Sequence, residues 1–182
     1  MKPVPGDISG SERARARLRV HLAILDGGVA PVVARYRSHI QCRAGCSECC
    51  HQSFRVSEVE GALLREGLAS APAVVRAQIV ARAGEYQAGR GEACPVLGDD
   101  GNCRLYDHRP RICRKYGIPL WNPERPHELN TCRLNFRGVE DLDAELIVEP
   151  QAAWAEDWIA LREQLGLGPQ DNRAIAAWLL DE

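Results

Sequence analysis

The sequence has few of the features that mark membrane, secreted or nucleic-acid-binding proteins. No stretch reaches the roughly 18 uninterrupted apolar residues of a membrane helix, so we expect no membrane partner. The first 20 residues contain neither the apolar core nor the cleavage site of a signal peptide. The net charge of −2 gives no reason to expect nucleic acid as a partner. We therefore predict a cytoplasmic protein.

Two further absences narrow the chemistry. Met1 is the only methionine, which disfavours copper handling through thioether ligands. No Gly-x-Gly-x-x-Gly loop follows an expected strand, and Gly89-Arg90-Gly91 follows an expected helix instead. The sequence therefore leans against an enzyme, and it assigns no catalytic residue.

The composition is that of one globular domain. The chain has 182 residues, of which 45% are apolar and 26% are charged. A domain of this size buries about 70% of its unfolded surface, so it can form a core without disulfides. We predict a single domain over residues 1–182. Residues 140–182 carry two basic and eleven acidic side chains, and we expect them to form acidic helices packed on the rest.

The apolar periodicity is mostly helical. Leu18, Leu22 and Leu25 fall on one helix face, and we expect Gly27-Gly28 to end that helix. Ser57 and Glu60 have the spacing of a capping box at the start of another helix. Further apolar stripes predict helices near residues 32–40, 63–68, 75–86, 154–165 and 175–179, and we expect Gly166 to end the fourth of these.

One segment departs from this helical pattern. Residues 94–106 contain two short apolar runs around Gly98-Asp99-Asp100-Gly101, which predicts a small β-hairpin or a tight loop. Pro110 then suits the first turn of a short helix that holds Cys113. Residues 117–152 are interrupted by prolines and allow no assignment.

Eight cysteines form two groups. The first is Cys42-x3-Cys46-x2-Cys49-Cys50, directly before His51, and the second comprises Cys94, Cys103, Cys113 and Cys132. Thiolates this close together repel one another unless a cation lies between them, and zinc or an iron–sulfur cluster takes about four of them. In a reducing compartment, clustered cysteines bind metal more often than they form disulfides. The sequence therefore predicts a metal centre, with His51 as a candidate ligand or supporting residue.

The predicted fold class is thus mainly α: a small helical domain with a short β-hairpin or loop insert, organised around a cysteine-bound metal centre. Five basic side chains and one acidic side chain, Asp107, lie between residues 104 and 115. Their net positive charge would offset the negative charge of the thiolates. Ligand counting does not separate zinc from iron–sulfur. A thiol redox sensor with Cys49 and Cys50 as its reactive pair is an alternative.

The segments CRAGCSECCH and CPVLGDDGNCRLYDHRPRICRKYG together resemble the YkgJ-type cysteine-cluster family, a zinc- or iron-chelating domain, over residues 38–135. The resemblance implies a metal-binding core. The flagellin lysine N-methylases share this cysteine pattern and are associated with an iron–sulfur cluster, which favours a 4Fe-4S cluster slightly over zinc. They also imply the alternative of an S-adenosylmethionine-dependent methyltransferase. By position, the metal ligands would be Cys42, Cys46, Cys49, Cys50, Cys94, Cys103, Cys113 and Cys132, supported by Tyr106, Arg109, Pro110 and Arg114.

Overall fold

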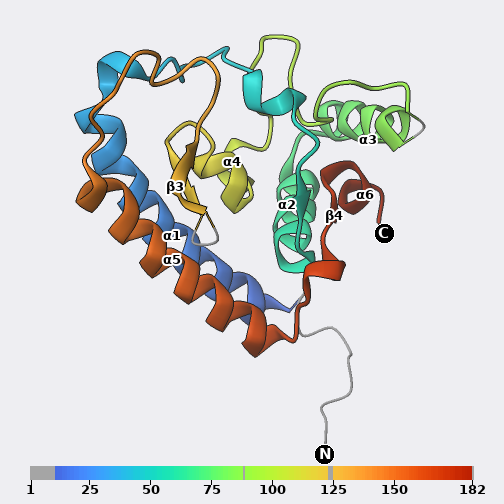
Figure 1. Cartoon of the computed structure of the whole chain (residues 1–182). Coiled ribbons are helices and arrows are strands. Elements are labelled where there is room, and N and C mark those ends of the chain that lie inside the picture. Colours follow the sequence, from blue (N-terminus) through green and yellow to red (C-terminus); the bar gives the residue numbers. More distant parts are fainter. Residues whose placement is uncertain (1–10, 88, 123–124, 182) are drawn as a thin grey trace, which may run out of the picture.

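Two long helices, α1 (Glu12–Arg35) and α5 (Ala144–Leu165), lie side by side along one edge of the molecule (Figure 1). This computed structural model describes residues 11–87, 89–122 and 125–181. The shorter helices are α2 (Glu58–Ser70), α3 (Ala73–Gln87), α4 (Arg111–Lys115) and α6 (Ile175–Leu180). The strands are β1 (Arg55–Val56), β2 (Leu120–Asn122), β3 (Arg125–Asn130) and β4 (Arg173–Ala174). Single 3₁₀ turns occupy Arg37–His39, Glu48–His51, Tyr106–His108 and Pro169–Asp171. The predicted mainly α fold is confirmed.

The Ser57 capping box and the stop at Gly166 are found as expected from the sequence, and Asp143 is a further cap that the sequence analysis did not identify. Ser57 precedes α2, and the Glu60 carboxylate accepts hydrogen bonds from the Ser57 N–H (3.0 Å) and hydroxyl (2.7 Å). Asp143 begins α5, where its side chain accepts a hydrogen bond from the Leu146 N–H. Gly166 ends α5 with φ of 68°, a conformation that glycine adopts without strain.

The expectation that Gly27-Gly28 ends the first helix is wrong. Helix α1 continues through both glycines and Pro31 to Arg35, so the two helices expected at residues 18–25 and 32–40 are largely one. A Cβ atom on Gly28 would lie 2.8 Å from the Trp154 ring. Gly28 therefore lets α1 and α5 approach closely, and this packing offsets the cost of about 1 kcal/mol for a glycine inside a helix.

For residues 94–106 the sequence allows a small β-hairpin or a tight loop, and the structure has the tight loop. This loop contains one antiparallel bridge, between Leu97 and Cys103. The two-stranded hairpin lies further along the chain, where β2 pairs with β3 in the stretch that allowed no assignment. A second antiparallel pair, β1 with β4, joins the segment before α2 to the segment before α6.

Three apolar clusters hold these elements together. One lies between α2, α3 and α6 and includes Leu64, Ile79 and Trp178. The other two lie against α1 and α5: one includes Ile118 and Trp154, and the other contains Leu18, Val59 and Leu161. In Figure 1, α4 and the β2–β3 hairpin lie between the α1–α5 pair and the group formed by α2, α3 and α6.

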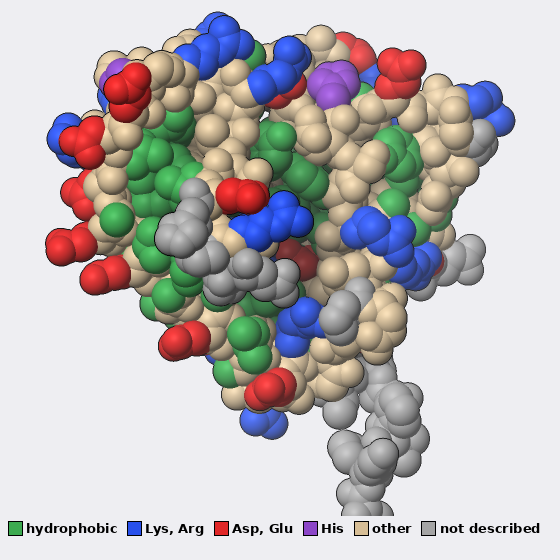
Figure 2. Space-filling model, viewed as in Figure 1, with side chains coloured by type: hydrophobic (Ala, Val, Ile, Leu, Met, Phe, Trp, Pro, Cys, Tyr) green, Lys and Arg blue, Asp and Glu red, His purple; other side chains and the backbone are tan. Residues whose placement is uncertain are grey.

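The outer face of α5 is acidic. Glu145, Glu149, Glu156 and Glu163 are exposed along it. Figure 2 shows acidic side chains along the corresponding edge of the molecule. Helix α5 packs against α1, and α6 packs against α2 and α3. Within the described ranges, no helix has the length and apolar character needed to cross a membrane.

Candidate metal centre

All eight cysteines line one cavity of about 750 Å³. Its walls come from the C-terminal half of α1, the loop over residues 40–54, the tight loop over residues 94–106, and α4 with the residues after it. Every cysteine carries a free thiol. The two cysteine groups begin at Cys42 and Cys94, more than 40 positions apart in the sequence. The fold brings both groups to the same cavity.

The first cysteine group lies on a loop shaped by turns. Gly45 has φ of 82°, and the Cys46 N–H donates to the Arg43 carbonyl across the turn before it. Cys49 and Cys50 then fall within a single 3₁₀ turn, where the Cys50 N–H donates to the Ser47 carbonyl at 2.8 Å. These turns fold the Cys42–Cys50 segment tightly enough for its sulfurs to face one cavity.

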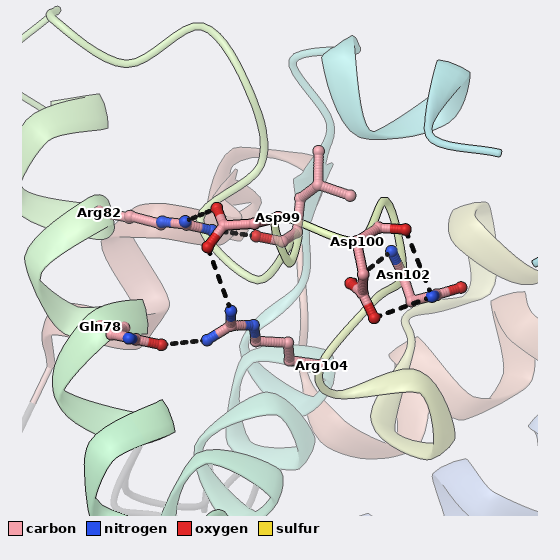
Figure 3. Close-up of polar contacts among 7 residues, drawn as sticks. Gln78, Arg82, Asp99, Asp100, Asn102 and Arg104 are labelled. Carbon is pink, nitrogen blue, oxygen red and sulfur yellow. Dashed lines mark hydrogen bonds and ion pairs between the residues drawn. The ribbon is translucent and has the colours of Figure 1, made fainter. Parts of the chain in front are cut away.

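The tight loop over residues 94–106 carries Cys94 and Cys103 and is fixed to helix α3 (Figure 3). Arg82 of α3 bonds to the Leu97 carbonyl and to Asp99. Arg104 bonds to Gln78, also on α3, and its guanidinium lies 3.7 Å from Asp99. The contacts of Arg82 and Arg104 therefore hold the loop against α3, and Cys94 and Cys103 of the same loop line the cavity.

The two cysteine loops also contact each other directly. The Cys94 N–H donates to the Cys50 carbonyl at 2.7 Å. The Gly45 N–H donates to the Asn102 side chain at 3.0 Å, and a Cβ atom on Gly101 would lie only 2.7 Å from the Gly45 carbonyl oxygen. These contacts hold the two loops side by side.

Cys113 is positioned by α4, whose first turn is anchored to a buried carboxylate. The Arg111 N–H donates to Glu60 at 3.0 Å, and Glu60 is the same side chain that caps α2. Arg114 of α4 bonds to Asp26 of α1 at 2.5 Å. Helices α1, α2 and α4 are thereby joined around the Cys113 side of the cavity.

Tyr106, Arg109 and Arg114, the expected supporting side chains, form a cluster beside Cys113. The Arg109 guanidinium stacks 3.5 Å from the Tyr106 ring centre and reaches the Cys113 carbonyl at 3.5 Å. The Arg114 Nε donates to the Arg109 carbonyl at 2.9 Å. Tyr106, Arg109, Pro110 and Arg114 all line the cavity, whereas His51 is exposed at the end of its turn and does not belong to the lining.

Asn135 holds Cys42 and Cys132 and was not anticipated from the sequence. Its amide donates to the Cys42 sulfur (3.4 Å) and to the Gly117 carbonyl (2.6 Å), while its oxygen accepts from the Gln41 N–H (2.8 Å). Its own N–H donates to the Cys132 carbonyl at 2.9 Å. Its position three residues after Cys132 is the one signal that could have singled it out.

Burial shapes the protonation of these thiols. It raises the pKa of Cys94 to about 12 and that of Cys113 well above the usual range, and the neighbouring thiolates act in the same direction. A hydrogen bond from the Cys50 S–H lowers the pKa of Cys49 to about 6, and the same bond raises the pKa of Cys50. A cation that binds here at neutral pH would therefore have to displace protons from most of the thiols.

The donor set fits a soft metal, because thiolate sulfur is the preferred ligand of zinc and of iron–sulfur clusters. The sulfurs are spread around the cavity. Over the described ranges, no three His, Cys, Asp or Glu side chains meet in an arrangement that could hold a metal ion. Closure around a single ion would thus require the cysteine side chains to turn toward one point.

Comparison with known proteins identifies the family. A family model described as "CxxCxxCC: Putative zinc- or iron-chelating domain" matches residues 41–133, about half of the chain, and this range includes all eight cysteines. The chain belongs to this family. The CxxCxxCC match supports metal binding through the cysteines and leaves zinc or iron open. No curated protein and no solved structure matches the chain.

Proposed function

We propose that this CxxCxxCC protein holds an iron–sulfur cluster in the cysteine-lined cavity and uses it for electron transfer or metal handling. The observation that carries the proposal is the convergence of all eight thiols, from two distant groups, on one cavity. Bound there, a cluster would supply a one-electron redox couple.

The cysteine spacing favours a cluster over a single zinc ion. The spacing Cys42-x3-Cys46-x2-Cys49 can place three sulfurs at three corners of a 4Fe-4S cube, with the fourth supplied from the second group.

Neighbouring groups would stabilise the negative charge of such a centre. Arg109 lines the cavity, and the Asn135 amide already donates to a cysteine sulfur. Hydrogen bonds and positive charges next to cluster sulfurs raise the reduction potential. We therefore assign Arg109 and Asn135 the role of tuning the centre, and the cysteines the role of ligands.

Anaerobic purification followed by iron, acid-labile sulfide and zinc analysis tests the proposal. We expect brown protein with iron and sulfide in equal amounts and a visible absorption that bleaches with dithionite. Colourless protein with stoichiometric zinc would replace the cluster with a zinc site. Protein that binds neither metal after reconstitution would overturn metal binding itself.

A thiol redox sensor is the second candidate, because the Cys50 S–H donates to a Cys49 thiol whose pKa is lowered to about 6. A thiolate at neutral pH is the reactive form of cysteine. Rapid alkylation of Cys49 and Cys50 in metal-loaded protein would favour this role, and protection of both by metal would exclude it. Methyl transfer stays a prediction from the resemblance.

We also propose a cytoplasmic location. Eight free thiols around one cavity would be oxidised to disulfides in a secretory compartment, whereas the cytoplasm keeps them reduced. Fractionation of the producing cells, with thiol labelling of the protein in each fraction, tests this location. Recovery of disulfide-bonded protein from an extracytoplasmic fraction would contradict it.

A further inference from the structure

We propose that the eight thiols form two four-cysteine centres that share the cavity, rather than one centre with spare cysteines. This inference rests on the proposed function. One set contains the first three cysteines of the loop and the last of the chain: Cys42, Cys46, Cys49 and Cys132. The other contains Cys50, Cys94, Cys103 and Cys113.

The second set belongs to one wall of the cavity. Cys94, Cys103 and Cys113 all pack against the apolar cluster between α2, α3 and α6. The Cys94 N–H donates to the Cys50 carbonyl at 2.7 Å, which brings Cys50 to the same wall. Beyond the effect of burial, charges on Cys94, Cys49 and Cys103 raise the pKa of Cys113, so Cys49 is also a neighbour of these thiols.

The first set belongs to another wall, where a Cβ atom on Gly117 would lie 2.7 Å from the Cys42 sulfur. Asn135 donates through its side chain to the Cys42 sulfur and through its backbone to the Cys132 carbonyl. The Glu48–Arg133 ion pair ties the 3₁₀ turn that carries Cys49 and Cys50 to the residue after Cys132.

Electrostatic neighbours follow the same division except at Cys49, whose charge also raises the pKa of Cys94 and Cys103. Apart from burial and the Asn135 hydrogen bond, the charges that raise the pKa of Cys42 are those of Cys46, Cys132 and Cys49. The pKa of Cys50 is raised first by its hydrogen bond to Cys49 and by burial. The charges that raise it further are those of Cys49, Cys94 and Cys103. Cys49 is thus adjacent to both sets and lies where they meet.

The number of ligands that each centre needs then assigns the neighbours Cys49 and Cys50 to different sets. A zinc ion and a 4Fe-4S cluster each take four thiolates, so eight thiols complete two centres. Cys49 completes the Cys42-x3-Cys46-x2-Cys49 spacing, while the backbone of Cys50 is already bonded to Cys94. The Cys49-Cys50 pair would therefore join the two centres through a single peptide bond.

Cadmium titration of the reduced, metal-free full chain under anaerobic conditions tests this division, because the ultraviolet thiolate-to-cadmium absorption counts bound ions. We expect wild type to bind about two ions per chain, at four thiolates for each. Cys113→Ser and Cys132→Ser should each bind about half of that amount, and the double variant should bind almost none. Ser47→Ala, which lies in the same loop and removes no sulfur, should match wild type.

The outcomes separate this inference from the proposed function. No cadmium binding by wild type would overturn both. One ion in wild type that is lost in both single variants would overturn the two centres and leave a single metal centre standing. Circular dichroism and thermal unfolding establish that each variant is folded. If Cys113→Ser does not fold, Cys103→Ser replaces it as the variant of the same set. If Cys132→Ser does not fold, Cys46→Ser replaces it, and each replacement should likewise bind about half as much cadmium as wild type.

Discussion

The α1–α5 helical pair and the cysteine loops are held in place by different forces. The pair is joined by buried apolar side chains such as Leu25, Trp154 and Leu161, which are 0–2% exposed. The loop over residues 40–54 is mostly exposed or half-buried, and turns and hydrogen bonds shape it. The difference indicates that the helices can fold without a metal, whereas the loops gain order when their sulfurs share one.

The largest effect should come from the helical pair. Trp154→Ala leaves a cavity where α5 packs on Gly28 of α1, and it should lower the free energy of unfolding by about 3–5 kcal/mol. Urea unfolding followed by circular dichroism measures this loss. Metal content per folded chain should not change, and a parallel loss of metal would show that the two regions are not separate.

A smaller effect is expected at Glu60, which links the two regions. Glu60→Ala leaves the N–H groups of Ser57 and Arg111 without their buried acceptor, which should cost about 2–3 kcal/mol at the usual cost of an unpaired buried donor. It should also weaken cadmium binding by the set that includes Cys113. Glu60→Gln keeps one acceptor and should lie between wild type and Glu60→Ala. Equal cadmium affinity in all three proteins would contradict the role of α4 in placing Cys113.

Asn135 should affect the opposite wall of the cavity. Asn135→Ala leaves the Gln41 N–H unpaired and frees the Cys42 sulfur, at a cost of about 1–2 kcal/mol. Cadmium binding by the Cys42 set should weaken, while binding by the Cys113 set should not. Asn135→Asp restores the acceptor but places a negative charge beside the sulfur, so it should recover stability without recovering affinity. Recovery of both would refute the role assigned to the amide donor.

The smallest effect is a pH dependence carried by the scaffold alone. His21 is buried, shares a 2.6 Å contact with Asp157 and accepts a hydrogen bond from Arg111 at 2.8 Å. Burial lowers the pKa of His21 below its usual 6.5, although Asp157 opposes this shift. The unfolded chain therefore binds the proton more readily, so the stabilisation is complete above pH 6.5 and declines below it.

Urea midpoints measured for metal-free protein between pH 7.5 and 5 reveal this decline. His21→Gln keeps an acceptor for Arg111 and does not titrate, so its midpoint should change less over this range. An equal slope in the two proteins would assign the pH dependence to other groups.

Local signals in the sequence predict most of the scaffold. The capping box at Ser57, the stop at Gly166 and the apolar stripes depend on neighbouring residues, and the structure reproduces them. The extension of α1 through Gly27-Gly28 depends instead on Trp154, which is more than 120 residues away. The β2–β3 hairpin was missed because its residues give no clear alternation.

The candidate site shows the same limit. Cysteine type and spacing identify the groups that line the cavity, because few other roles require so many thiols together. The side chains that hold them in place, Asn135 and Glu60, accept hydrogen bonds from N–H groups 94 and 51 positions away. The capping-box spacing predicts the bond of Glu60 to Ser57 but not its bond to Arg111. Pairing across such distances is visible only in three dimensions.

The central claim is that the thiols of the two cysteine groups converge on an inorganic centre. Anomalous diffraction at the iron and zinc absorption edges, from crystals of anaerobically purified protein, tests it most directly. The account predicts anomalous density inside the cavity, in contact with sulfurs of the 42–50 loop and of residues 94–132. Metal bound only at the surface, or cysteines joined as disulfides with no metal between them, would contradict it.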